Sequence, residues 1–468
     1  MDVDQENTES REKNKGETAG EDPGQGTGTD IKTGENACGG SGQRPWPCPQ
    51  GYVIPPPDFF DEYPDTVDTD RAEVEENREG IVGTLGLFGI GATVARITVG
   101  PHITRYDLAV QKSVTLQTIE GCKGALSKAL QVWRVRVCPG YAQGTVAIEV
   151  PNREREVAGM RNMLESPGYV NADPDSLTFC IGKDIEGKKV FGDLAKTGNL
   201  LVAGCCGSGM SAFLNAMIIS LIMKHSPGEL RLILIDTWEV EFTVYGRLPH
   251  LLTGGIICDM DKAVAALDWV TRETERRHAL FAKRRAEGQA VRDIDGYNAS
   301  VTDRAERLPR IVLIVNELYR LTVAAKKEIE DRIGRIAGRG CAAGIHLVLA
   351  TGWPSADVIT DALQSAFPSR VALMVRTEED SRRILGEKGA ETLLGLGDML
   401  YRFPGMDVPV RVQGARVSRA DISCFCDIIR EDNEACFDQA ASDFINSGEK
   451  SGADGGAGKD SPKEAEPV

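Results

Sequence analysis

The stretch that decides the fold is LLVAGCCGSGMSAFLNAMI, residues 200–218, in which an apolar run leads into a glycine-rich loop and then a helical pattern. A buried strand, a glycine-rich turn and a helix in this order are the setting that a Walker A phosphate-binding loop requires. In such a loop the glycines let backbone N–H groups converge on phosphates at the amino end of a helix. The sequence therefore predicts a phosphate-binding loop formed by Gly204, Cys205, Cys206, Gly207, Ser208, Gly209, Met210 and Ser211.

This loop lacks the lysine that normally reaches the β- and γ-phosphates, because Met210 stands at that position. A thioether is uncharged and donates no hydrogen bond, so the terminal phosphate loses its main counter-charge. Ser211 keeps the hydroxyl that binds Mg²⁺ in such loops. We therefore expect the backbone cradle and Ser211, the candidate metal ligand, to remain in use.

The second half of a hydrolysing site is an acidic pair after a buried strand, with one carboxylate for Mg²⁺ and one to polarise the attacking water. The strand pattern RIVLIVN ends here in Asn316, and Glu317 follows it. Asn316 brings no negative charge to a metal, so Glu317 is left as the catalytic candidate. Two such losses in one site favour lost hydrolysis over neutral drift.

Short apolar runs alternate with helical stretches on both sides of the loop. Runs that are apolar on both faces and separated by helices predict a parallel sheet covered by helices on both sides. Between residues 74 and 165, a helical pattern is followed by alternating, strand-like runs, which predicts a small α+β domain. The runs assigned to the parallel sheet are LLVAG (200–204), LRLILID (230–236), RIVLIVN (310–316), HLVLAT (346–351) and RVALMV (370–375).

The formal charge of −16 lies mostly at the two ends of the chain. Residues 1–75 carry 18 acidic and 6 basic groups and residues 447–468 carry 5 and 3, which leaves −2 for the residues between them. The nearly neutral body does not exclude DNA binding through local basic patches. The ends are poor in branched apolar residues, which predicts a disordered acidic arm over residues 1–73 and a short helix with a disordered tail over residues 431–468.

The cysteines and the hydropathy indicate a cytoplasmic protein without a membrane span. The 12 cysteines show neither CxxC nor metal-site spacing, and nothing resembles a secretory signal, so we expect reduced thiols. No run approaches the ~20 apolar residues that a membrane helix needs.

Beyond the loop, the chain resembles the FtsK/SpoIIIE family of DNA-pumping ATPases from about residue 52 to residue 429. The resemblance rests on an ordered series of motifs. GPHITRYDLAV (100–110) and AIEVPNREREVAGMRNML (147–164) resemble the family's linker domain, and AAGIHLVLATGWPSADVIT (342–360) and GAETLLGLGDMLYRFPG (389–405) resemble its motor. The resemblance implies a RecA-like P-loop NTPase motor over residues 166–430, with helices on both faces of a parallel sheet, preceded by an α+β linker domain over residues 74–165.

The family resemblance also implies a hexameric ring that uses ATP and Mg²⁺ to step along duplex DNA without sequence specificity. Where the family has Gln-Arg before a proline, this chain has Gly352 and Trp353, which removes a polar sensor. We therefore expect weak or residual ATP binding and little hydrolysis. The expected role is that of a ring subunit in DNA handling or chromosome segregation, in a homo-oligomer or beside an active paralogue.

The candidate DNA contacts are basic residues in a charge-rich, loop-like stretch: Lys283, Arg284, Arg285 and Arg292. They are weak candidates, since charge runs are usually solvated faces and contacts to the DNA backbone carry no sequence information. Two other functions stay open. One is an active ATP-driven translocase of double-stranded DNA, in which another cation replaces Met210. The other is a non-catalytic protein–protein scaffold whose acidic arm recruits partners.

Overall fold

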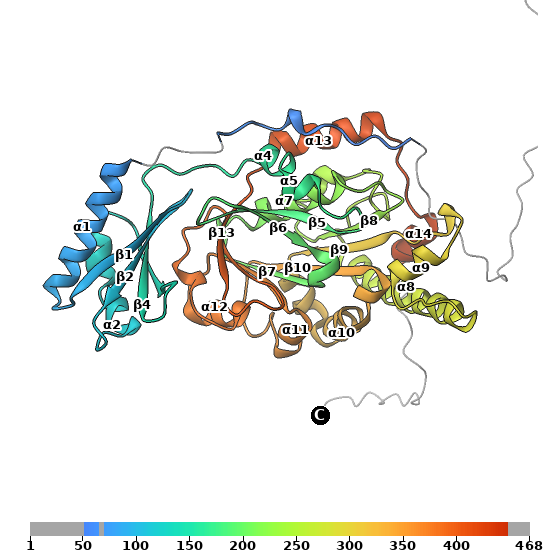
Figure 1. Ribbon diagram of the computed structural model, residues 1–468. Coiled ribbons are helices and arrows are strands. Elements are labelled where there is room, and N and C mark those ends of the chain that lie inside the picture. The colour runs from blue at the N-terminus through green and yellow to red at the C-terminus, as the bar shows by residue number, and fades with distance from the viewer. Residues whose placement is uncertain (1–50, 65–69, 448–468) are drawn as a thin grey trace, which may run out of the picture. The chain divides into compact units, whose positions relative to one another are not determined.

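The protein is described by a computed structural model that places residues 51–64 and 70–447. The predicted acidic arm before residue 51 and the predicted tail after residue 447 lie outside these described residues. Two folded regions follow one another along the described chain, a small α+β domain and a larger α/β domain (Figure 1).

The α/β domain is built on a nine-stranded sheet whose order is β6-β5-β13-β12-β11-β7-β10-β9-β8. The five strands β11, β7, β10, β9 and β8 run parallel, as the apolar runs predicted. Their bounds are β7 Leu200–Ala203, β8 Leu230–Asp236, β9 Arg310–Asn316, β10 Ile345–Thr351 and β11 Ser369–Leu373.

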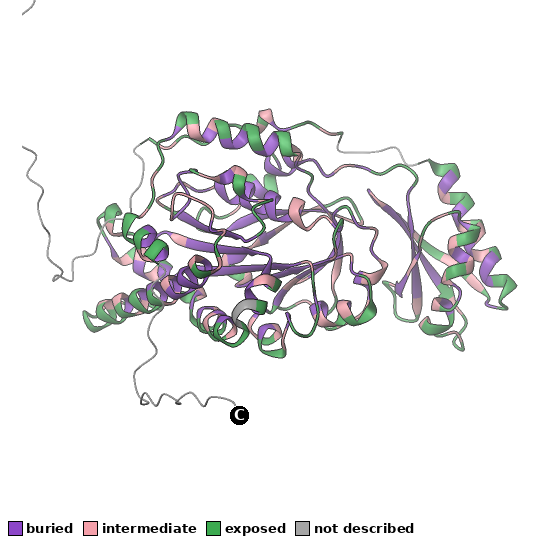
Figure 2. Ribbon diagram, turned by 180° about the vertical axis from the view of Figure 1, so that it is seen from behind, coloured by how far each residue is buried: buried purple, intermediate pink, exposed green. Residues whose placement is uncertain are grey.

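Both faces of this sheet are buried, which is why its strands read as continuous apolar runs. Along β7, Leu200 and Val202 belong to one core, whereas Leu201 and Ala203 belong to the core on the opposite face. The first core includes residues of α7 (Met210–Ile222) and α13 (Arg419–Asp432), and the second includes residues of α8 (Met260–Ala286) and α10 (Leu318–Arg339). Figure 2 shows buried strands between helices whose outer faces are exposed. The predicted α/β motor fold is confirmed.

Four further strands extend the sheet in an antiparallel manner, which the apolar runs did not predict. β12 pairs with β11, and β13 joins the hairpin of β5 and β6 to β12. These strands are β5 Thr178–Asp184, β6 Lys189–Asp193, β12 Asp398–Arg402 and β13 Val410–Gly414. Polar residues such as Lys183 and Arg411 interrupt their apolar pattern.

The α+β domain is an antiparallel sheet of order β1-β2-β4-β3. Helix α1 (Arg71–Leu87) packs on it through Ile81 and Leu85, which share a core with Tyr106 and Ile148. The strands are β1 Ala92–Val99, β2 Ile103–Val110, β3 Arg136–Pro139 and β4 Thr145–Pro151, and α2 Leu116–Glu120 and α3 Lys123–Ala129 lie between β2 and β3.

Residues 51–64, which composition assigned to the acidic arm, pack against the α/β domain. The rings of Phe59 and Phe60 stack near Phe425 of α13, with centroids 6.0 and 6.3 Å from it. These rings supply apolar surface that offsets the entropy of ordering the segment. The remaining helices are α4 Met160–Leu164, α5 Pro167–Val170, α6 Leu194–Thr197, α9 Ile294–Ser300, α11 Asp361–Ala366, α12 Glu378–Leu385 and α14 Gln439–Ser447. Among the described residues, no helix has the length and apolar character needed to cross a membrane.

Candidate nucleotide site

The loop between β7 and α7 has the conformation of a phosphate cradle. Gly207 and Gly209 adopt φ values of +78° and +101°, which L side chains rarely take. A Cβ on Gly209 would lie 2.3 Å from the backbone nitrogen of Gly397, so only glycine fits there. The glycine spacing in the sequence therefore reflects two real backbone constraints.

Neighbouring segments hold the loop through backbone hydrogen bonds. The Gly204 N–H donates to the carbonyl of Thr351 at the end of β10 (3.2 Å), and the Cys205 N–H donates to the carbonyl of Met374 beyond β11 (2.8 Å). On another side, the N–H groups of Leu396 and Gly397 donate to the carbonyls of Gly207 (3.2 Å) and Ser208 (2.7 Å). These bonds fix the shape of the loop against the ends of β10 and β11 and the turn of residues 394–397.

The residues present fit a phosphate chain. In the described part of the chain, no acceptor takes the N–H groups of Gly207, Gly209, Met210 and Ser211, as expected at the amino end of a helix that can bind an anion. The hydroxyl of Ser208 is fully buried and has no hydrogen-bond partner among the described residues. These free donors point to an anionic ligand.

Met210 occupies the usual lysine position and packs against the apolar core. It therefore supplies no positive charge there. A cation that sequence reasoning missed lies nearby. Burial raises the pKa of the Cys205 thiol, and the positive charge of Arg376 opposes that rise. Arg376 is exposed and lies two residues after Met374, whose carbonyl accepts the Cys205 N–H. Arg376 is therefore the candidate substitute counter-charge.

Asn316 ends β9 as predicted and is nearly buried beside Asp236 at the end of β8. Its amide nitrogen lies 3.4 Å from an Asp236 oxygen. That carboxylate is fully buried and accepts backbone N–H groups of the following loop, at Trp238 (3.4 Å), Val240 (3.1 Å), Glu241 (2.8 Å) and Phe242 (3.0 Å). Asp236 thus fixes a loop and does not replace the missing carboxylate.

Only β10 lies between β9, which Glu317 follows, and β7, which leads into the phosphate loop. Glu317 therefore lies close to this loop. Its carboxylate is already engaged: it accepts the Tyr319 N–H (3.1 Å) as the cap of α10, the Gly352 N–H (2.6 Å) and the hydroxyl of Thr351. A Cβ on Gly352 would lie 3.1 Å from one of its oxygens. Glu317 therefore serves as a structural cap in this conformation.

The donor set offered to Mg²⁺ is reduced accordingly. The Ser211 hydroxyl and the Asn316 amide oxygen are neutral, whereas Mg²⁺ in phosphate sites is usually held by one or two carboxylates together with the substrate phosphates. Asp236 and Glu317 are both committed to backbone N–H groups. The site fits a phosphate better than it fits a metal.

Two exposed tryptophans, Trp238 and Trp353, follow the carboxyl ends of β8 and β10. Trp353 stands where a polar group was expected. Trp353 is 59% exposed and its ring centroid lies 5.8 Å from that of Tyr319. Trp238 is 56% exposed, with the guanidinium of Arg320 4.8 Å from its ring centroid. The sequence signalled the departure at Trp353 but not that the Arg320 guanidinium would lie over the Trp238 ring.

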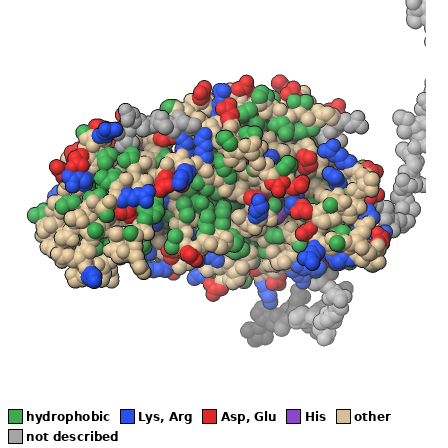
Figure 3. Space-filling model, viewed as in Figure 1, with side chains coloured by type: hydrophobic (Ala, Val, Ile, Leu, Met, Phe, Trp, Pro, Cys, Tyr) green, Lys and Arg blue, Asp and Glu red, His purple; other side chains and the backbone are tan. Residues whose placement is uncertain are grey.

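The candidate DNA contacts lie away from the loop, and Lys283, Arg284 and Arg285 form the last turn of α8. Their placement in a loop was wrong, since the helix continues to Ala286, where basic side chains interact favourably with its dipole. Arg284 pairs with Glu287 (3.6 Å) and Glu306 (3.3 Å), whereas Lys283 and Arg292 are exposed. Figure 3 shows basic and acidic side chains interspersed on the face it displays.

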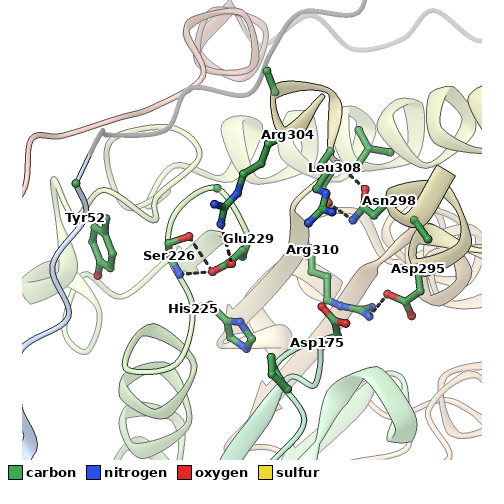
Figure 4. Close-up of a pocket in the computed structure, with 16 residues that line it drawn as sticks. Tyr52, Asp175, His225, Ser226, Glu229, Asp295, Asn298, Arg304, Leu308 and Arg310 are labelled. Carbon is green, nitrogen blue, oxygen red and sulfur yellow. Dashed lines mark hydrogen bonds and ion pairs between the residues drawn. The ribbon is translucent and has the colours of Figure 1, made fainter. Parts of the chain in front are cut away.

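A cavity of about 920 Å³ opens at the amino ends of β8 and β9, the edge of the sheet opposite the phosphate loop (Figure 4). Its charged side chains are largely paired with one another. Arg310 bonds to Asp295 (2.6 Å), and Arg304 lies 3.8 Å from Glu229. The cavity contains none of the predicted site residues.

Comparisons with known proteins agree with this architecture. The model of the FtsK/SpoIIIE family matches residues 161–366, and that of the FtsK alpha domain matches residues 54–152. A DNA translocase FtsK of Clostridium tetani is 39% identical over 382 residues, covering 81% of this chain and 50% of that protein. A DNA translocase SftA of Bacillus subtilis is 38% identical over 374 residues, covering 79% of this chain and 39% of that protein.

The chain thus spans about half the length, or less, of these curated relatives. Among solved structures, the conjugation coupling protein TcpA of pCW3, in its monomer form with ATPγS, superposes with a TM-score of 0.53. It is 18% identical, and the match covers 76% of this chain and 99% of that one. This likeness supports the fold of a P-loop motor.

Proposed function

This chain belongs to the FtsK/SpoIIIE family, and we propose that it is a ring subunit that binds a nucleotide and duplex DNA but hydrolyses ATP slowly or not at all. Its role would lie in DNA handling or chromosome segregation. The relatives are named as DNA translocases, which supports the DNA-binding part of the proposal. The ring would consist of identical subunits or of a mixture with an active paralogue.

The observation that carries the proposal is that each charged group expected near the terminal phosphate is absent or committed elsewhere. Met210 is neutral and packs on the core, and Asn316 is an amide. Glu317 accepts hydrogen bonds from Tyr319 and Gly352. Removing one donor that stabilises charge in a transition state typically costs ~10²–10³ in rate, so we expect the combined losses to leave the site nearly inactive.

We expect phosphate binding to persist without these charged side chains, because backbone N–H groups make the contacts. The free N–H groups of Gly207, Gly209, Met210 and Ser211 lie at the amino end of α7, where the helix dipole favours an anion. We therefore expect the chain to bind ATP weakly and to hold it without turnover.

Arg376 favours a second candidate function, an active translocase. If its guanidinium moves over the loop when a nucleotide binds, it would restore the counter-charge that Met210 lacks. The two functions differ in one measurable property, since both bind nucleotide but only the active translocase releases phosphate when duplex DNA is added.

The test combines calorimetry with ATP and a phosphate-release assay on the purified chain, with and without duplex DNA. We expect measurable binding, with phosphate release at background under both conditions. Met210→Leu changes the shape of the side chain but not its charge, so it should bind ATP and release phosphate as wild type does. Rapid DNA-stimulated phosphate release by the wild-type chain would overturn the proposal and favour the Arg376 alternative.

A further inference from the structure

A buried cluster of charges joins the α+β domain to the α/β domain. Strands β2, β3 and β4 contribute Arg105, Asp107, Arg136 and Glu149, and strands β12 and β13 contribute Asp398 and Arg411. Three side chains are positive and three are negative, so the cluster is neutral as a whole. Buried charges persist only when they are paired in this way.

Arg411 is the member that both domains share. Its guanidinium binds Asp398 through two parallel hydrogen bonds, Nε to Oδ1 (2.9 Å) and Nη2 to Oδ2 (2.6 Å). Its third nitrogen, Nη1, donates to Glu149 of β4 at 2.6 Å. Bidentate pairing of this kind fixes orientation as well as distance, and lysine cannot reproduce it.

From Asp398 the connection continues to the phosphate loop. The Oδ2 atom of Asp398 also accepts the N–H of Leu394 (2.8 Å), which closes the turn of residues 394–397. In that turn the N–H groups of Leu396 and Gly397 donate to the carbonyls of Gly207 and Ser208. A path of hydrogen bonds, linked by the backbone of residues 394–397, therefore runs from β4 of the α+β domain to the nucleotide loop.

We infer that Arg411 is a positioning residue through which the α+β domain sets the position of the turn of residues 394–397 and, through it, the shape of the phosphate loop. The inference rests on the proposed nucleotide site for its consequence, a change in nucleotide affinity. Its structural part concerns only the contact between the turn and the loop. A displacement of β4 would weaken the hold on Gly207 and Ser208.

A second contact between the same domains provides a matched control. Lys388, which follows α12, binds both carboxylate oxygens of Glu120 at 2.7 Å. This pair also crosses between the domains, but it is bonded to neither Asp398 nor Arg411. Glu149→Gln removes the carboxylate charge on the path to the loop, whereas Glu120→Gln removes one away from it.

The experiment measures hydrogen exchange at the amides of Leu396 and Gly397 in the full chain, together with the affinity for a fluorescent ATP analogue. For Glu149→Gln we expect roughly tenfold faster exchange at these two amides and about three- to tenfold weaker analogue binding, typical for a residue that couples sites without contacting the ligand. Glu120→Gln should leave both quantities unchanged. Arg411→Lys, which keeps the charge but loses the bidentate geometry, should behave as Glu149→Gln does.

Should Glu149→Gln fail to fold, Arg411→Lys carries the same test. Equal exchange rates at Leu396 and Gly397 in wild type, Glu149→Gln and Arg411→Lys would overturn the inference, as would an equal rise in Glu120→Gln. If wild type binds no nucleotide, the proposed function fails, while the exchange rates still decide whether the α+β domain holds the loop.

Discussion

Replacing Glu149 by glutamine is expected to make the free energy of unfolding depend less on pH at acid pH. The carboxylate is 1% exposed and pairs with Arg105 (3.2 Å), Arg136 (3.0 Å) and Arg411 (2.6 Å). Burial alone would raise its pKa, but these three guanidinium groups outweigh burial and lower the pKa from 4.5 to about 2. At ~1.4 kcal/mol per pKa unit, the ionised carboxylate contributes about 3 kcal/mol to the free energy of unfolding at neutral pH.

The direction of the pH dependence follows from this lowered pKa. The unfolded chain binds a proton at Glu149 at a higher pH than the folded chain does, so the contribution is complete above about pH 4.5 and is lost as the pH falls toward 2. Urea unfolding of wild type and Glu149→Gln across this range gives the difference between their free energies of unfolding. Titration of the other carboxylates largely cancels in that difference.

We expect this difference to shrink by about 3 kcal/mol between roughly pH 5 and pH 2. The variant itself should be less stable than wild type at neutral pH, because it leaves three buried guanidinium groups with one carboxylate fewer. A difference that stays constant over the whole range would refute the reasoning, since it would mean that ionised Glu149 is not preferentially stabilised in the folded state.

Three further predictions concern the site and its partners. Arg376→Ala should leave ATP affinity in calorimetry nearly unchanged, because backbone N–H groups hold the phosphate; a loss of about tenfold, expected of one charge-assisted hydrogen bond, would instead favour Arg376 as the counter-charge. Gly209→Ala should abolish the thermal shift produced by ATP, because its Cβ would overlap the backbone of Gly397, and a retained shift would contradict the described cradle. Duplex DNA affinity should fall steeply as salt rises, and replacing Lys283 and Arg292 by alanine should reduce the slope by about one to two units; salt-independent association would favour the scaffold function instead.

The parallel half of the motor sheet could be predicted from the sequence because its signal is local. Runs such as residues 230–236 and 310–316 are apolar on both faces, and each became one strand. The phosphate loop was equally accessible, since glycines at 207 and 209 meet a backbone requirement that lies within the loop and its immediate neighbours.

The antiparallel half of the sheet was harder to predict because its strands mix polar and apolar residues for reasons set elsewhere in the chain. Arg411 interrupts β13, yet it is buried because Glu149, 262 positions earlier, lies against it. No local pattern in residues 410–414 contains that information.

The site shows the same limit. The sequence identified Asn316 and Glu317 as the pair at the end of β9, and the structure places Glu317 against Gly352 and Asn316 against Asp236. It could not reveal that Thr351 and Gly352 engage Glu317, or that Asp236 is held by the loop after β8, because those hydrogen bonds join the ends of different strands. Whether a carboxylate is available for chemistry depends on such contacts.

The decisive measurement is DNA-stimulated phosphate release by the wild-type chain and by the double variant Met210→Lys/Asn316→Asp, assayed side by side at saturating ATP. We expect background release from wild type and a clear rise in the double variant, because both missing charges are then restored. Fast release from wild type that the double substitution does not increase would show that the wild-type site hydrolyses ATP without these charges.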